Sequence, residues 1–158
     1  MKPVFPMRLR ALACVLAALS LAACSAGEAP RTAQFVPPVE TQQDFGDLRV
    51  HFNALPTLSL SEAVAREYGV ERTAGTALVV IAVRRIKGAE EVAMEGDVSA
   101  VARDLSGKQQ TLHFRPVRTG DYIDHIGTVD VGAHDTYRFE VTVRADGRTG
   151  TLQFARNF

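Results

Sequence analysis

Carboxylate and imidazole side chains gather between residues 121 and 135. The stretch contains Asp121, Asp124, His125, Asp130, His134 and Asp135. Their oxygen and nitrogen atoms are common ligands of metal cations in proteins. If the stretch forms a hairpin, these groups could converge on one cation or small polar ligand, and five of them form the candidate site: Asp121, Asp124, His125, His134 and Asp135. Simple turn formation is the alternative, because such residues are frequent in turns and no His-x-x-x-His or EF-hand spacing occurs.

Other groups that could do chemistry lack the partners that catalysis needs. Ser59 and Ser61 precede a predicted helix, where capping explains them, and no Gly-x-Ser-x-Gly elbow is present. Glu90 and Glu91 are adjacent in a predicted turn, so they point apart and make a poor acid–base pair. No glycine-rich phosphate loop occurs, and we expect no cofactor. The sequence thus predicts a protein that is not an enzyme, and a hydrolase with an unrecognised site is the weakest of three readings.

The elements that must position these residues are mostly β-strands. Apolar and polar residues alternate in runs separated by turn residues at intervals of roughly ten residues. The runs are residues 48–53, 77–83, 92–103, 110–117, 122–131, 137–144 and the segment from 152. About seven such strands are typical of an immunoglobulin-like or fibronectin-like antiparallel β-sandwich, and a small antiparallel barrel is the rival architecture.

The run 77–83 is apolar throughout, which predicts a central strand covered on both faces. The basic residues after it, Arg84, Arg85 and Lys87, are expected to form a solvated strand end. Gly127 lies inside another predicted strand and suggests a bulge.

One short helix is predicted before the central strand. Ser59 or Ser61 can cap its start, and Gly69 follows as its C-terminal cap. A helix this short is not stable alone, so we expect it to cover one end or edge of a sheet. Near the end of the chain, Asp146-Gly147 is a strong hairpin signal.

The first 23 residues have the features of a signal peptide. A positively charged start precedes an apolar run that is too short to cross a bilayer and ends in small residues. Its end, Leu21-Ala22-Ala23-Cys24, resembles the lipobox of bacterial lipoproteins. The resemblance implies that Cys24 becomes the first residue of the mature chain and carries palmitate-type acyl chains. Ser25 follows it, and under the sorting rule of Gram-negative lipoproteins this implies the outer membrane, facing the periplasm.

An ordinary secretory signal with an incidental cysteine is the alternative. If Cys24 is acylated, no free cysteine is left, because Cys14 lies in the signal and the chain has two cysteines. Thiol nucleophiles, disulfides and cysteine metal sites are then excluded.

Between the signal and the strands, residues 24–43 are rich in proline and small polar residues and are expected to form a flexible tether. The mature chain has 15 basic and 18 acidic residues, a formal charge of −3. A weakly acidic domain lacks the basic surface that nucleic acid requires, and the lipid anchor alone would hold it at the membrane.

The predicted domain, residues 44–158, resembles the domain of unknown function 4426 family, which comprises short exported proteins of Gram-negative bacteria. The segments that carry the resemblance are Asp44-Phe45-Gly46, residues 50–54 (VHFNA), residues 64–70 (VAREYGV), Asp121-Tyr122-Ile123 and residues 137–141 (YRFEV). The resemblance implies an exported single domain and carries over no catalytic residue.

Two kinds of function are expected. The first is a non-enzymatic envelope module that binds another envelope protein or supports an assembly, since the predicted fold presents loops and edges for contact. The second is a periplasmic protein that binds a small ligand or a metal ion in the region from Asp121 to Asp135.

Lipidation at Cys24 gives a direct prediction. When cells that express the full-length protein are labelled with a palmitate analogue, the wild type should carry the label and sediment with membranes, because two or more acyl chains make membrane binding effectively stable. The Cys24→Ser variant should carry no label. An unlabelled wild-type protein that is released by osmotic shock would contradict the anchor.

Overall fold

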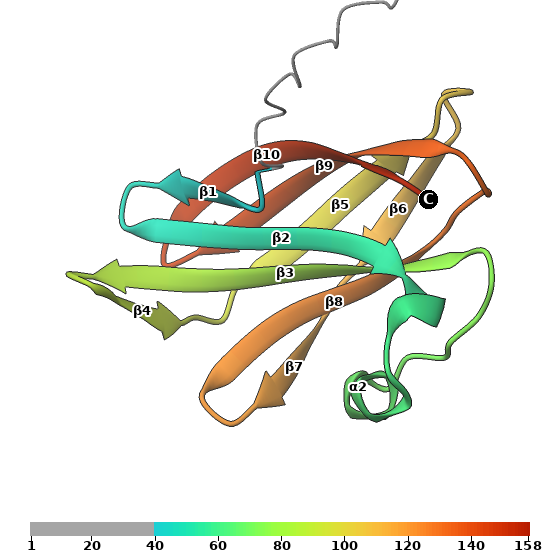
Figure 1. The fold of residues 1–158 in the computed structure, drawn as a ribbon. Helices are drawn as coiled ribbons and strands as arrows, with labels where there is room; N and C mark the ends of the chain where they lie inside the picture. The colour runs from blue at the N-terminus through green and yellow to red at the C-terminus, as the bar shows by residue number, and fades with distance from the viewer. Residues whose placement is uncertain (1–39) are drawn as a thin grey trace, which may run out of the picture. The chain divides into compact units, whose positions relative to one another are not determined.

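The structure, a computed structural model, describes residues 40–158. They form two antiparallel sheets packed face to face, with one short α-helix beside them (Figure 1). The elements in chain order are β1 (Gln42–Phe45), β2 (Leu48–Pro56), a 3-10 turn (Thr57–Ser59), α2 (Glu62–Tyr68), β3 (Thr76–Lys87), β4 (Glu90–Ala93), β5 (Asp97–Arg103), β6 (Gln109–His113), β7 (Arg115–Thr119), β8 (Tyr122–Asp130), β9 (Thr136–Ala145) and β10 (Arg148–Asn157).

Two sheets, rather than one closed barrel, make up the domain. The first has the order β1-β2-β3-β8-β7, with β4 also paired to β3, and the second has the order β10-β9-β5-β6. All of the strand pairs are antiparallel. The strand order β2-β3-β8-β7 in one sheet, facing β10-β9-β5 in the other, is that of an immunoglobulin-type sandwich. The predicted all-β sandwich is therefore confirmed.

The structure corrects the number and limits of the strands. The predicted strands 92–103 and 110–117 are each two strands, because the chain passes from one sheet to the other near Gly96 and again at Phe114. β1 adds a strand where the tether was expected to run to residue 43. Alternation persists across such a crossing, so the pattern alone does not reveal it. The signal peptide, Cys24 and the tether up to residue 39 lie outside the described residues.

The main core lies between the two sheets. Alternate residues of β2, β3, β5, β9 and β10 fill it. Phe139 stacks on Phe154, and Phe154 stacks on Phe52, with 4.8 Å between ring centroids in both pairs. Each fully buried side chain of this size stabilises the fold by roughly 1.5–3 kcal/mol, so packing between sheets accounts for the stability of a domain without cysteine.

A second, smaller core lies on the opposite face of β3. Leu60 and Ala65, from the segment of α2, pack there against Leu78 and Ile126. The helix thus covers the outer face of the sheet rather than plugging its end. Of the two serines predicted as its N-terminal cap, Ser61 is the cap, since its hydroxyl accepts a hydrogen bond from the Val64 N–H at 3.2 Å. The predicted C-terminal cap is confirmed, because the chain turns at Gly69 with φ of 58°. Within residues 40–158, no helix has the length and apolar character needed to cross a membrane.

The ionisable side chain of His125 lies in the interior. It is 3% exposed, and its Nδ1 atom has no hydrogen-bond partner among the described residues. Burial lowers the pKa of His125 below its usual value, although the carbonyl groups of Ile81 and Gly96 and the charge of Asp124 act in the opposite direction. The positive charge of Arg84 lowers the pKa further. We therefore expect a neutral ring in the folded protein at neutral pH.

This burial predicts a loss of stability in mild acid. The unfolded chain takes up a proton on His125 near pH 6.5, while the folded protein does not until a lower pH. The free energy of unfolding should therefore fall as the pH is lowered from about 7.5 through 6.5, by at most about 1.4 kcal/mol per pH unit from this residue.

Urea titrations of wild type and His125→Gln at several pH values measure the effect, and the variant should lose this part of the slope. Should the variant not fold, the ring chemical shift of His125 in the wild type provides the second readout. A ring that takes up a proton at or above pH 6.5 in the folded state would contradict the prediction.

Gly150 generates a packing prediction. A Cβ atom there would lie 2.8–2.9 Å from three ring atoms of Phe45, which brings β1 against β10. Gly150→Ala should therefore displace the ring and lower the free energy of unfolding by about 1–3 kcal/mol, measured by urea titration. In a Phe45→Ala background the same substitution should cost almost nothing. An equal cost in both backgrounds would show that the ring is not the cause.

Candidate functional site

The structure separates the five residues of the predicted site. Asp121 precedes β8, while His134 and Asp135 follow its far end. A nine-residue strand spans roughly 26 Å, so the two ends cannot share a ligand. Asp124 and His125 are consecutive in β8 and point to opposite faces of the sheet, with His125 inside.

The five residues therefore do not converge on one ligand, contrary to the expectation from the sequence. Within residues 40–158, no group of three or more His, Cys, Asp or Glu side chains is placed to hold a metal ion. His134 is exposed, and Asp135 accepts a hydrogen bond from the Thr136 N–H at 2.7 Å, as a turn residue does. Neighbouring side chains in β8 point to opposite faces of the sheet. The sequence-based expectation of convergence did not take this alternation into account.

Asp124 belongs to a structural network on the outer face of the first sheet. Arg84 donates to the Ile123 carbonyl at 2.8 Å and to Asp124 Oδ1 at 3.3 Å, while the Tyr68 hydroxyl donates to Asp124 Oδ2 at 2.9 Å. Burial and the bond to Asp124 raise the pKa of Tyr68 to about 12. Arg84 is 8% exposed, so the prediction of a solvated strand end is wrong for this residue. β3 pairs with β8 as far as Ile81 and with β4 from Arg84 onward. At this change of partner strand, the Arg84 guanidinium donates hydrogen bonds to the Val83 and Ile123 carbonyl groups.

A second network ties β1, β2 and β4 together. Arg49 bonds Asp44 through two nitrogens at 2.7 and 2.8 Å and Glu91 at 2.8 Å, and His51 Nε2 lies 2.7 Å from the other Glu91 oxygen. Arg49 lowers the pKa of Asp44, and Arg49 followed by His51 lowers that of Glu91. Glu91 lies in β4, not in the predicted turn. Glu91 is 42 residues from Arg49 and 40 residues from His51, so no local pattern could have indicated these two contacts.

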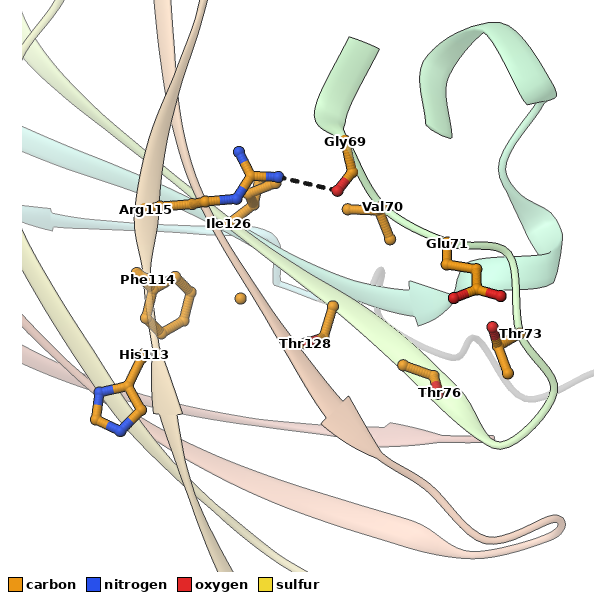
Figure 2. Close-up of a pocket in the computed structure, with 11 residues that line it drawn as sticks. Gly69, Val70, Glu71, Thr73, Thr76, His113, Phe114, Arg115, Ile126 and Thr128 are labelled. Atoms are coloured by element: carbon orange, nitrogen blue, oxygen red, sulfur yellow. Dashed lines mark hydrogen bonds between the residues drawn. The ribbon is translucent and has the colours of Figure 1, made fainter. Parts of the chain in front are cut away.

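A cleft with a volume of about 520 Å³ lies beside α2 and the outer face of β8. Figure 2 shows this cleft in close-up. Its lining consists of Gly69, Val70, Glu71 and Thr73 from the segment after α2, Thr76 from the start of β3, His113, Phe114 and Arg115 from the β6–β7 crossing, and Ile126, Gly127 and Thr128 from β8.

The cleft exists because β7 is shorter than the strand it pairs with. The last pair between them is Arg115 with Ile126, whereas β8 pairs with β3 as far as Asp130. No strand in the described part of the chain pairs with this edge of β8 beyond Ile126. At the far end the Gln110 amide takes the place of a strand, accepting from the Asp130 N–H at 3.2 Å and donating to its carbonyl at 2.8 Å.

Arg115 reaches across the cleft to the end of α2. Its Nη2 atom donates to the Tyr68 carbonyl and, at 3.3 Å, to the Gly69 carbonyl, as the dashed line in Figure 2 shows for Gly69. These are terminal carbonyl groups of a helix, which attract a positive charge. The sequence analysis missed Arg115. The proline after it was a usable signal, because proline inside a predicted strand indicates a break or an edge.

One protein family and several solved structures are similar to this chain. The family model described as "Domain of unknown function (DUF4426)" matches residues 42–158. A solved DUF4426 family protein from Pseudomonas aeruginosa is 29% identical, with a TM-score of 0.63, and the match covers 74% of this chain and 92% of that one. No curated protein matches the chain significantly.

Two structures of FetP from uropathogenic Escherichia coli share the fold. A copper-bound variant has a TM-score of 0.54 at 10% identity, and the as-isolated protein has 0.50 at 9%. Both matches cover 76% of this chain, and they cover 89% and 92% of the FetP chains. Similarity at this level of identity concerns the fold alone. The family match, in contrast, spans well over half of the sequence and includes the sandwich described above. This chain therefore belongs to the DUF4426 family, whose function is unknown.

Proposed function

We propose that this protein is a non-enzymatic binding module of the cell envelope, attached through lipid on Cys24 to the periplasmic face of the outer membrane. We further propose that it binds a small organic ligand in the cleft between the segment after α2 and the edge of β8. The cleft is the observation that carries the proposal. Its volume of about 520 Å³ lies within the range of small-molecule sites.

The lining has the mixture of groups that ligand sites use. Apolar surface comes from Val70, Phe114 and Ile126, while hydroxyl and charged groups come from Thr128 and Arg115, among others. A few polar groups on an apolar wall orient a ligand and give specificity.

The copper-bound FetP structure raises the metal-binding alternative. In this chain, the described region has no cluster of three potential ligands, and the lining of the cleft offers one histidine and one carboxylate. We therefore propose an organic ligand rather than a metal ion.

Binding of another envelope protein is the second candidate. The observation that favours it is the edge of β8 beyond Ile126, because a free strand edge can accept a strand from a partner. The Gln110 amide already bonds the backbone N–H and carbonyl groups of Asp130 at this edge. This shortens the stretch of β8 with which a partner's strand could pair, and it favours the small ligand.

A substitution that fills the cleft tests the proposal. The full-length protein, purified from membranes in mild detergent, is screened by thermal shift against sugars, nucleosides, dicarboxylates, amines and amino acids. At least one compound class should raise the melting temperature of the wild type. Thr128→Trp should abolish the shift, because the indole ring occupies the cleft above β8.

Thr111→Trp is the matched control, since Thr111 is also an exposed strand threonine but lies outside the cleft. It should keep the shift. If no compound stabilises the wild type more than Thr128→Trp, the small-ligand function is wrong. Recovery of a specific crosslinked protein that Thr128→Trp no longer captures would then support the second candidate.

A further inference from the structure

Two arginine side chains lie directly opposite each other on the outer face of the second sheet. Arg103 on β5 and Arg138 on β9 are paired residues of neighbouring strands. Their neighbours Ala102 and Phe139 face the main core, so the two arginines point outward, and both are exposed. Residues paired in this way have their Cβ atoms roughly 5 Å apart, and like charges at such a position destabilise the sheet.

Another pair of charged residues on the same two strands has the complementary arrangement. Arg144 of β9 lies opposite Asp97 of β5, and both are exposed. An arginine opposite an aspartate supports strand pairing, whereas Arg103 opposite Arg138 opposes it. Within residues 40–158, no carboxylate lies within ion-pair distance of Arg103 or Arg138. An anion placed between the two guanidinium groups would relieve their repulsion.

The two arginines border a small depression in this face, with a volume of about 150 Å³. The Gln109 amide oxygen, once the amide is turned toward Arg103, accepts from the two Nη atoms of that residue at 2.6 and 2.9 Å. This contact holds the Arg103 guanidinium at the edge of the depression. The remaining lining residues are Val101, Glu140 and Gln153.

The carboxylate in the lining, Glu140, bonds a residue on the other side of β9. Its Oε2 atom accepts from the Gln153 amide at 2.9 Å. Gln153 belongs to β10, which pairs with β9 on the side away from β5. With two arginines and one glutamate in its lining, the depression keeps a net positive charge.

We propose that this depression binds a phosphate group between Arg103 and Arg138. Guanidinium groups donate paired N–H groups to the oxygens of phosphate. Because the two side chains start from directly opposed positions on one face, both can reach a single phosphate group. The proposal goes beyond the proposed function, since no residue of this depression lines the cleft. Inorganic phosphate and the headgroup of an anionic phospholipid share this chemistry, and the test separates them.

Melting curves at constant ionic strength test the site. The full-length protein in mild detergent is melted in sodium chloride and in sodium phosphate of the same ionic strength. Phosphate should raise the melting temperature of the wild type above its value in chloride, because a ligand of the folded state stabilises that state. The phosphate concentration needed for half of the shift should rise at least about tenfold in Arg103→Gln and in Arg138→Gln, as expected for loss of a charge-assisted hydrogen bond.

Arg138→Gln also has a readout that a structural role would not give. In chloride at low ionic strength, this substitution removes the repulsion and should leave the melting temperature equal to or above that of the wild type. Arg144→Gln is the matched control, because Arg144 is an exposed arginine of the same strand and face but lies outside the depression. It should keep the full response to phosphate.

A third series replaces inorganic phosphate by dihexanoyl phosphatidylglycerol, added below its critical micelle concentration, with dihexanoyl phosphatidylcholine as the zwitterionic counterpart. A shift with inorganic phosphate shows that the phosphate group suffices. A shift that phosphatidylglycerol alone produces, and that Arg138→Gln abolishes, assigns the site to a lipid headgroup. The proposal is wrong if phosphate and chloride give the same melting temperature and phosphatidylglycerol acts equally on the wild type and Arg138→Gln. The proposed function, which is tested at the cleft, is unaffected by that result.

Discussion

The outer face of β3 has to be kept from water, and much of the molecule follows from that constraint. β3 is apolar on both faces, and the second sheet covers only the inner one. The chain therefore folds α2 back over Leu78. This places the last carbonyl groups of the helix within reach of Arg115 on β7. The cleft lies at the border of this cover, between the segment that leaves α2 and the strand edge it does not reach.

Charged groups on the outer face of the first sheet divide into two kinds. The network of Arg84 and Asp124 and the network of Arg49 and Glu91 have protein partners and hold strands together. Such groups are satisfied by the fold itself, and replacing one partner would leave the other without its bond. Arg115 and Glu71 differ, because the described residues give them no partner of opposite charge. Other exposed charges, such as Glu90 and Arg138, also lack an ion pair, and what sets Arg115 and Glu71 apart from these is that both line the cleft.

The region from Asp121 to Asp135 illustrates why a local concentration of ligand-type residues is weak evidence for a site. In an extended strand, each residue advances the chain by about 3.3 Å and reverses the side-chain direction. Asp124 therefore joins the outer network, while His125 enters the interior, where burial lowers its pKa. The same residue types on a helix or in a loop could have converged. Secondary structure, rather than composition, decided the outcome.

The sequence by itself determined the class of fold and its local features. Alternation indicated most of the strands, either Ser59 or Ser61 together with Gly69 marked the ends of α2, and Asp146-Gly147 marked the last hairpin, where both residues have positive φ. These signals are local, because they depend on the backbone and side chain of a few neighbouring residues. Tertiary structure alone decided where the chain passes from one sheet to the other, as at Phe114. It also decided which charged residues form ion pairs, as Arg84 and Asp124 do. Pairing between distant strands sets those positions, and periodicity within one strand carries no information about its partner. The cleft, assembled from three separate segments, could for the same reason be seen only in the folded chain.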